Sequence, residues 1–208
     1  MSRVPDSVPP RPLRGFEAMH RYWDMGENNW VAPVLPGNYY VTTSGEVIST
    51  VLGSCVSTCV RDPVIGIAGL NHFMLPNQGG TYQAADALRY GCFAVERLIN
   101  ELVKYGAARE RLEIKIFGGG KVIPGMSDIG LKNIRFVHEY FETEGLVICA
   151  EDTGGTWARR VRYHTGTGRV LIQRLQTQET NQVVSREAEL QRSLSIVPPP
   201  HGEVDLFD

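Results

Sequence analysis

The sequence predicts an α/β fold, as a single layered domain with a mixed, mostly antiparallel sheet and two main helices. Three observations support this prediction. The first third of the chain is rich in short strand patterns, two segments with helical periodicity follow with a strand between them, and a hairpin pattern comes after the second helix. A length of 208 residues suits one domain with tails.

The expected strands are short runs of β-branched and aromatic residues bounded by glycine, proline, asparagine or aspartate. They lie at 39–43, 47–52, 56–60, 65–73, 112–117, 146–150, 158–164 and 169–175. The two expected helices repeat apolar residues at spacings of three and four. They span 82–105, ended by Gly106, and about 128–144, capped by Ser127 or Asp128 and ended by Gly145.

The two ends of the chain differ in composition from its centre. Residues 1–35 form an N-terminal extension with a proline-rich start, followed by aromatics that we expect to pack on the domain surface, the alternative being a partner-binding arm. We expect residues 36–175 to form the main domain, which contains the strands and helices given above. Residues 176–208 form a polar C-terminal tail, in which 183–194 is at most a marginal surface helix.

Composition and charge exclude several classes of protein. The chain is 42% hydrophobic and 21% charged with a net charge of -2, which gives no basic surface for nucleic acid. No apolar run approaches the roughly 18 residues of a membrane span, and the first residues lack the apolar core of a secretory signal. The cysteines show neither a disulfide framework nor a CxxC motif. We therefore expect a cytoplasmic protein with reduced thiols and no membrane insertion.

The strands at 56–60 and 65–73 carry the strongest chemical signal. Cys55 precedes the first strand and His72 lies near the end of the second, while Asp62-Pro63 opens the turn between them. If the turn is centred between residues 63 and 64, Cys55 and His72 are direct cross-strand partners on one face. A thiol with a base in reach suits nucleophilic catalysis. We then expect Cys55 to be a partly exposed thiolate and the most reactive of the cysteines.

Other interpretations of these residues are weaker but remain open. A buried cysteine is often only a small hydrophobic residue, and a lone histidine is often structural. A zinc site of Cys55, Cys59, His72 and Cys92 is weak, because Cys92 belongs to the apolar stripe of the first helix. The loop Gly118-Gly119-Gly120-Lys121 lacks the spacing of a phosphate-binding P-loop.

Several motifs resemble the chemoreceptor glutamine deamidase family (CheD type). The resemblance covers about residues 36–173, and its motifs occur in the family's order. They are Pro36-Gly37-Asn38-Tyr39-Tyr40-Val41-Thr42, Thr50-Val51-Leu52-Gly53-Ser54-Cys55, Arg61-Asp62-Pro63, Asn71-His72-Phe73-Met74-Leu75-Pro76, Arg89-Tyr90-Gly91, Phe117-Gly118-Gly119-Gly120, Ile129-Gly130 with Asn133, and Asp152-Thr153-Gly154-Gly155.

The resemblance implies a fold similar to the catalytic domain of the cytotoxic necrotizing factor toxins. It implies hydrolysis of selected glutamine side chains on the cytoplasmic helices of methyl-accepting chemotaxis receptors to glutamate, through a cysteine thioester and with release of ammonia. Cys55 would be the nucleophile and His72 the base. The family's third catalytic residue, a threonine six positions before the cysteine, would fall on Ser49, with Thr50 the next candidate. No cofactor or metal is implied, and a CheC-type chemotaxis phosphatase is the further partner that the resemblance suggests.

Two other function classes remain beside the deamidase. The protein could be a non-catalytic adaptor that binds receptors or a chemotaxis phosphatase without turnover. It could also be a transglutaminase-like enzyme that passes the acyl group to an amine rather than to water.

Overall fold

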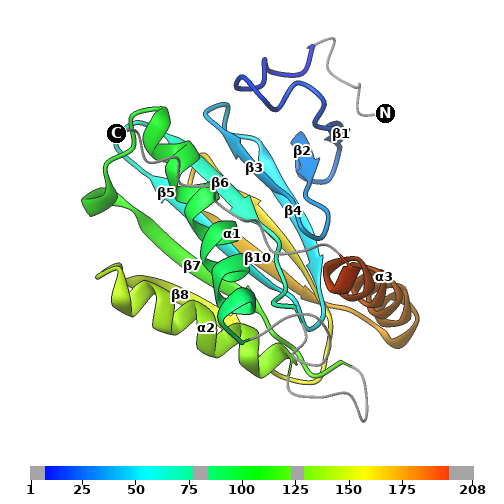
Figure 1. Cartoon of the computed structure of the whole chain (residues 1–208). Helices are drawn as coiled ribbons and strands as arrows, with labels where there is room; N and C mark the ends of the chain where they lie inside the picture. Colours follow the sequence, from blue (N-terminus) through cyan, green and yellow to red (C-terminus); the bar gives the residue numbers. More distant parts are fainter. Residues whose placement is uncertain (1–7, 77–83, 123–128, 197–208) are drawn as a thin grey trace, which may run out of the picture.

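Two five-stranded β-sheets packed face to face form the centre of the protein, and two helices cover one side (Figure 1). The computed structural model describes residues 8–76, 84–122 and 129–196. The strands are β1 (Tyr22–Asp24), β2 (Asn29–Pro33), β3 (Tyr39–Thr42), β4 (Val47–Leu52), β5 (Val56–Asp62), β6 (Ile67–Asn71), β7 (Glu113–Gly118), β8 (Ile148–Thr153), β9 (Arg159–His164) and β10 (Arg169–Arg174). The helices are α1 (Ala84–Lys104), α2 (Ile129–Thr143), α3 (Thr177–Ile196) and the short 3-10 helix η1 (Arg109–Arg111).

The order of the strands explains which segments are buried. The first sheet has the order β1-β2-β4-β9-β10 and the second has the order β3-β6-β5-β7-β8. The second sheet lies between the helices and the first sheet, so β5 is buried on both faces. In β9, buried and half-buried residues alternate, because only one face meets the core. The core cluster accordingly contains residues of both sheets and of α1 and α2.

The α/β class predicted from the sequence is confirmed, but the single expected sheet is two sheets. The N-terminal extension adds β1 and β2 to the first sheet, where β2 pairs in parallel with β4. Trp23 and Trp30 face each other across β1 and β2 with ring centroids 5.8 Å apart. The aromatics of this segment thus take part in strand pairing. The expected start of the first helix at 82 and the cap at 127–128 lie outside the described residues.

The turn between β5 and β6 is longer than predicted. Asp62 pairs with Ile67, and four residues connect them, with Gly66 at φ 70° and its N–H bonded to the carbonyl of Asp62. Val56 therefore pairs with Phe73, so Cys55 is not directly opposite His72. The predicted register is wrong by two positions. Because side chains alternate with a period of two, this shift leaves both residues on the same face.

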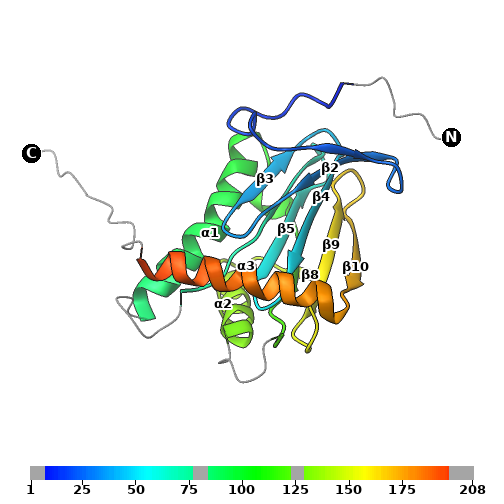
Figure 2. The same ribbon diagram turned by 90° about the vertical axis from the view of Figure 1, so that its right-hand side faces the viewer.

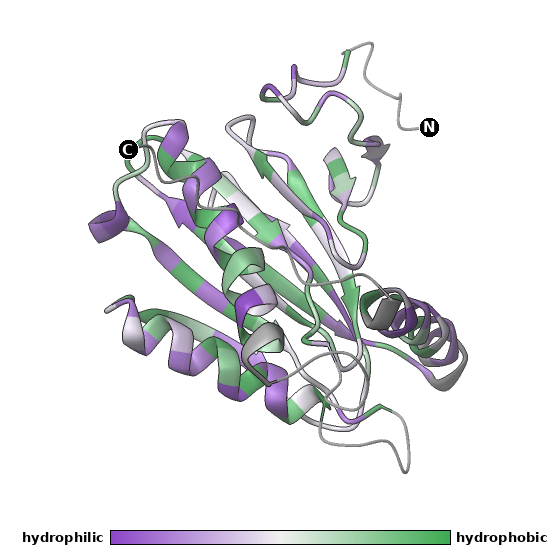
Figure 3. Ribbon diagram, viewed as in Figure 1, coloured by the Kyte–Doolittle hydropathy of each residue, from purple (hydrophilic) through white to green (hydrophobic). Residues whose placement is uncertain are grey.

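The third helix, α3, does not lie on the sheet face that α1 and α2 cover. Figure 2 shows it running across the ends of β4 and β5, and in Figure 3 it is coloured largely hydrophilic. Its buried residues are Val183, Glu187 and Leu194, and Val183 packs with Ala158 and Leu175. Of the helices that the structure describes, none is both long and apolar enough to cross a membrane.

Candidate active site

The turn from β4 to β5 at Gly53-Ser54-Cys55 is held by its three carbonyl groups. The carbonyl of Gly53 accepts the N–H of Gly120, and that of Cys55 accepts the N–H of Gly119, each at 2.7 Å. The side-chain amide of Asn133 donates to the carbonyl of Ser54 at 2.8 Å. These bonds fix all three peptide planes. The glycine-rich loop of the sequence therefore shapes this turn, as does Asn133 at the start of α2.

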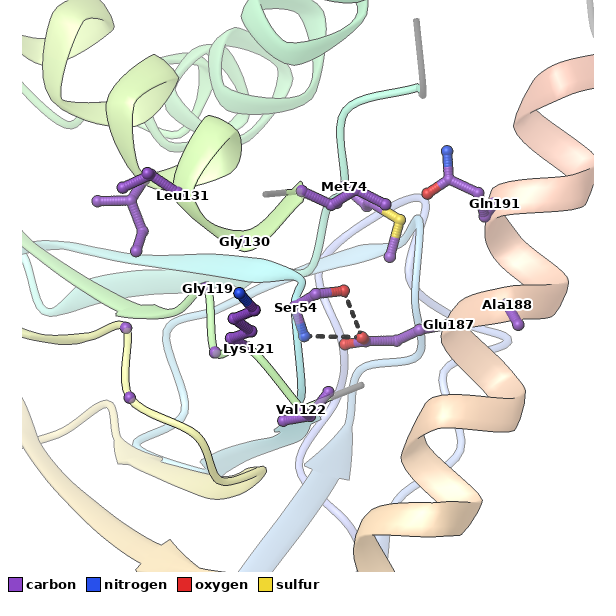
Figure 4. A pocket seen from close by; sticks show the side chains of 15 residues that line it. Ser54, Met74, Gly119, Lys121, Val122, Gly130, Leu131, Glu187, Ala188 and Gln191 are labelled. Atoms are coloured by element: carbon purple, nitrogen blue, oxygen red, sulfur yellow. Dashed lines mark hydrogen bonds between the residues drawn. The ribbon is translucent and has the colours of Figure 1, made fainter. Parts of the chain in front are cut away.

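With the carbonyls bonded outward, the N–H groups of Gly53, Ser54 and Cys55 converge on one point, and we call these three donors the amide nest. The carboxylate of Glu187, on α3, fills it. Figure 4 shows the hydrogen bonds between this carboxylate and Ser54. One oxygen accepts from Gly53 at 2.7 Å and Cys55 at 3.1 Å, and the other accepts the N–H and the hydroxyl of Ser54, both at 2.7 Å. Such a nest stabilises negative charge, as an oxyanion hole does.

Cys55 and His72 meet beside the amide nest. The sulfur of Cys55, a ring nitrogen of His72 and a carboxylate oxygen of Glu187 all lie within 4.8 Å of one another. His72 follows β6, and its backbone N–H and carbonyl bond Asn38 and Gly37, which fixes the chain at that point. The sequence prediction that Cys55 and His72 come together on one face is confirmed, although the contact is diagonal rather than directly cross-strand.

The imidazole of His72 is oriented by Thr50. The Thr50 hydroxyl donates to the carbonyl of Val34 at 2.8 Å, so toward His72 Nδ1, also 2.8 Å away, it acts as acceptor. Nδ1 therefore carries the proton, and Nε2 keeps the free electron pair of a base. Nε2 is buried and has no hydrogen-bond partner among the described residues. It is thus available to the thiol of Cys55.

This geometry corrects the sequence assignment of the orienting hydroxyl to Ser49. Along β4, Ile48, Thr50 and Leu52 face the core, whereas Ser49 is half-buried on the opposite face. The count of six positions back from Cys55 therefore selects a residue whose side chain points away from His72. Among the described residues, the hydroxyl bonded to the His72 ring belongs to Thr50.

Burial sets the protonation of the pair. Burial raises the pKa of the Cys55 thiol well above its ordinary value, and the charge of Glu187 and its hydrogen bond with Cys55 raise it further. Burial lowers the pKa of His72 to about 4, although the charge of Glu187 opposes this change. The pair is therefore a neutral thiol and a neutral imidazole in this arrangement. The expectation of a partly exposed thiolate is wrong, because Cys55 is fully buried and Cys149 is the exposed cysteine.

Cys55, His72 and Glu187 also have the atom types of a metal site. The surroundings of Glu187 argue against a cation there, since both of its oxygens already accept hydrogen bonds from three backbone N–H groups and a hydroxyl. Those donors present positive charge toward the site. The arrangement suits a carboxylate or an oxyanion better than a metal ion.

The sequence interpretation missed Glu187, since residues 176–208 were expected to be a polar tail. A signal was present, because Val183, Glu187, Leu190 and Leu194 share one face of a helix by their spacings of four, three and four. A carboxylate in the middle of an apolar stripe must find partners in the surface it covers. Which partners these are could not be known from the sequence.

Comparisons with known proteins identify the family. A family model described as "CheD chemotactic sensory transduction" matches residues 74–174. A Hahella chejuensis protein named "Probable chemoreceptor glutamine deamidase CheD" is 45% identical over 96% of this chain and 95% of its own length. Proteins of the same name are similar in Halorhodospira halophila, at 42% identity over 98% and 94%, and Bordetella parapertussis, at 50% over 76% of each chain.

One solved structure shows weak similarity to this chain. The crystal structure of Bacillus licheniformis hypothetical protein YfiH matches with a TM-score of 0.29 and 16% identity, over 47% of this chain and 33% of that one. A match at this level supports no argument about fold or function. The assignment comes instead from the relatives that match nearly the full length of the sequence, and by that similarity this chain belongs to the CheD family.

Proposed function

We propose that this protein hydrolyses the side-chain amide of selected glutamines on chemoreceptors, producing glutamate and ammonia. One observation carries the proposal. The sulfur of Cys55 lies within 4.8 Å of a ring nitrogen of the base His72, and the Cys55 N–H belongs to an amide nest suited to the oxyanion of acyl transfer. The names of the full-length relatives supply the substrate, because they describe chemoreceptor glutamine deamidases.

In the proposed mechanism, Nε2 of His72 takes the proton of the Cys55 thiol as the sulfur bonds to the side-chain carbonyl carbon of the substrate glutamine. The carbonyl oxygen becomes an oxyanion held by the amide nest. His72 then returns the proton to the nitrogen, the carbon–nitrogen bond breaks, and ammonia leaves a thioester. Water attacks this thioester after giving a proton to His72, and cleavage of the carbon–sulfur bond releases glutamate and restores the thiol. Thr50 acts as a positioning residue for His72.

The proposed substrate also gives the proposed location and partners. The glutamines lie on the cytoplasmic helices of the receptors, so we place the protein in the cytoplasm. A CheC-type chemotaxis phosphatase is a proposed second partner, supported by the family resemblance of the sequence motifs. An adaptor that only binds receptors would leave unexplained why a thiol meets a histidine nitrogen at an anion-binding nest, where that nitrogen has no hydrogen-bond partner in the described part of the chain.

The test is incubation of the full chain with purified cytoplasmic fragments of chemoreceptors, followed by peptide mass spectrometry. We expect specific glutamines to become glutamates, and no such change with Cys55→Ser or His72→Ala. A labelled primary amine added to the reaction separates hydrolysis from transglutamination, since only the latter incorporates the label. The test is also made with Glu187→Ala, in which the carboxylate that fills the amide nest is removed. If receptor glutamines stay amides with both the native chain and this variant, a deamidase is refuted and the adaptor is favoured.

A further inference from the structure

Among the described residues of α3, Glu187 is the carboxylate that is buried. Its neighbours on the buried stripe of α3 are Val183, Leu190 and Leu194, which pack against the domain, while most other described side chains of the helix are exposed. Glu187 itself is only 2% exposed. A buried charge is costly unless it is paired or hydrogen bonded, and here its partners are the oxyanion donors of the site.

The group held in the amide nest is chemically the product of the proposed reaction. A glutamate side chain, carried on a helix, lies against the thiol of Cys55 with its carboxylate on the donors that would hold the oxyanion. We propose, on the basis of the proposed function, that α3 is a built-in product mimic that closes the active site, and that a substrate glutamine enters the same nest on a receptor helix that displaces α3.

The cavities beside α3 support a receptor helix as the element that would replace it. A cavity of about 220 Å³ opens on one side of Glu187, between Ser54, Gly120 and Gln191, and is shown in Figure 4. A second cavity of about 100 Å³ opens on the other side, between His72, Thr50 and Val183. Glu187 lines both. Glu187 therefore borders two cavities that the side chains of α3 leave unfilled, and a helix with bulkier side chains could fill them.

The stripe of α3 predicts the sequence pattern of the substrate helix. The reacting residue would have an apolar residue four positions before it and apolar residues three and seven positions after it, as Glu187 has Val183, Leu190 and Leu194. This spacing places all four side chains on one helix face. Exchange with a second helix is feasible, because only Val183, Glu187 and Leu194 are buried among the described side chains of α3. The ion pair between Glu179 and Arg160 is half-exposed.

Full-length Glu187→Gln provides a direct test, because it converts the product mimic into a tethered substrate. We expect the introduced glutamine to be deamidated to glutamate within the same chain, seen by peptide mass spectrometry as replacement of the amide nitrogen by oxygen. The rate should not depend on protein concentration. Glu189→Gln is the matched control, because Glu189 is exposed on the same helix and the amide introduced there should persist. When Glu187→Gln is combined with Cys55→Ser, the amide at position 187 should stay intact.

A second measurement covers the case in which the introduced glutamine side chain leaves the nest. Alkylation of Cys55 by iodoacetamide should be slow in the native chain and at least tenfold faster in Glu187→Ala, with Glu189→Ala unchanged. A peptide of residues 177–196 with the Glu187→Gln substitution should be deamidated by the Glu187→Ala enzyme, and less readily when Leu190 of the peptide is replaced by Asp.

The outcomes separate the two proposals. If the enzyme deamidates receptor fragments, but the glutamine introduced at position 187 stays an amide in both the chain and the peptide, the product mimic is refuted and the proposed function stands. If native Cys55 is alkylated as fast as the exposed Cys149, α3 does not close the site. If receptor fragments, peptide and the Glu187→Gln chain are all unchanged, the proposed function itself fails.

Discussion

Replacing Thr50 by valine tests whether it orients the catalytic base. Valine keeps the shape of threonine but removes the hydroxyl that accepts the Nδ1 proton of His72 at 2.8 Å. A buried donor left without its partner costs about 1–3 kcal/mol. At 1.36 kcal/mol per tenfold change in rate, this range corresponds to about a 5- to 150-fold loss of kcat. We expect the lower part of the range, about tenfold, because the freed carbonyl of Val34 can accept the proton instead.

The assay is steady-state deamidation of a receptor fragment by full-length variants, with kcat and KM determined separately. A positioning role predicts a fall in kcat at nearly constant KM, and a change in the pH profile of kcat as the basicity of His72 changes. Thr50→Ser should restore most of the rate, because it restores the hydroxyl. Ser49→Ala should stay within about twofold of the native rate. A substitution at such a half-exposed position usually changes the free energy of unfolding by about 0.5 kcal/mol at most. A larger loss for Ser49→Ala than for Thr50→Val would refute the assignment.

Three further predictions concern the nucleophile loop, the thiol and the fold. Gly118→Ala should abolish deamidation and lower the melting temperature, because Gly118 has φ 108° and an added methyl group would collide with the Cys55 carbonyl; near-native activity would contradict this view of the loop. The alkylation rate of Cys55 in the native chain should rise only at strongly alkaline pH, because its pKa is raised, and Glu187→Ala should move that rise to lower pH; identical pH profiles would contradict the role of Glu187. Asp62→Asn should lower the free energy of unfolding at pH 7 by about 1–3 kcal/mol, as measured by urea denaturation. The Arg111 guanidinium lowers the pKa of Asp62 to about 2, so this stabilisation is complete above about pH 4 and is lost as the pH falls toward 2; an unchanged difference at pH 2 would contradict the pairing.

Much of the fold follows from local sequence patterns. The helices α1 and α2 and the strands from β3 to β10 lie close to their predicted positions, because apolar periodicity and glycine turns act over a few residues. The pairing of Cys55 with His72 on one face was also predictable. The period of two along a strand keeps two residues on the same face even when the turn is two residues longer than predicted.

The choice between Ser49 and Thr50 lay beyond the sequence, because both faces of β4 carry apolar residues. Val47 and Val51 share one face with Ser49, and Ile48 and Leu52 share the other with Thr50. Either set could have faced the core. Only the stacking of the two sheets decided that Thr50 points toward His72 and Val34.

Glu187 shows most clearly what the tertiary structure alone decided. The sequence placed a carboxylate in the apolar stripe of a helix, which required it to find hydrogen-bond donors wherever the helix packs. The donors are backbone N–H groups of the turn that contains Cys55, which is 132 positions away along the chain. Because backbone groups are the same at every residue, the sequence does not mark which of them act as donors. Their direction is set by the carbonyl bonds to Gly119, Gly120 and Asn133. Local patterns determined the elements and the paired thiol and imidazole, whereas long-range packing determined what fills the site they form.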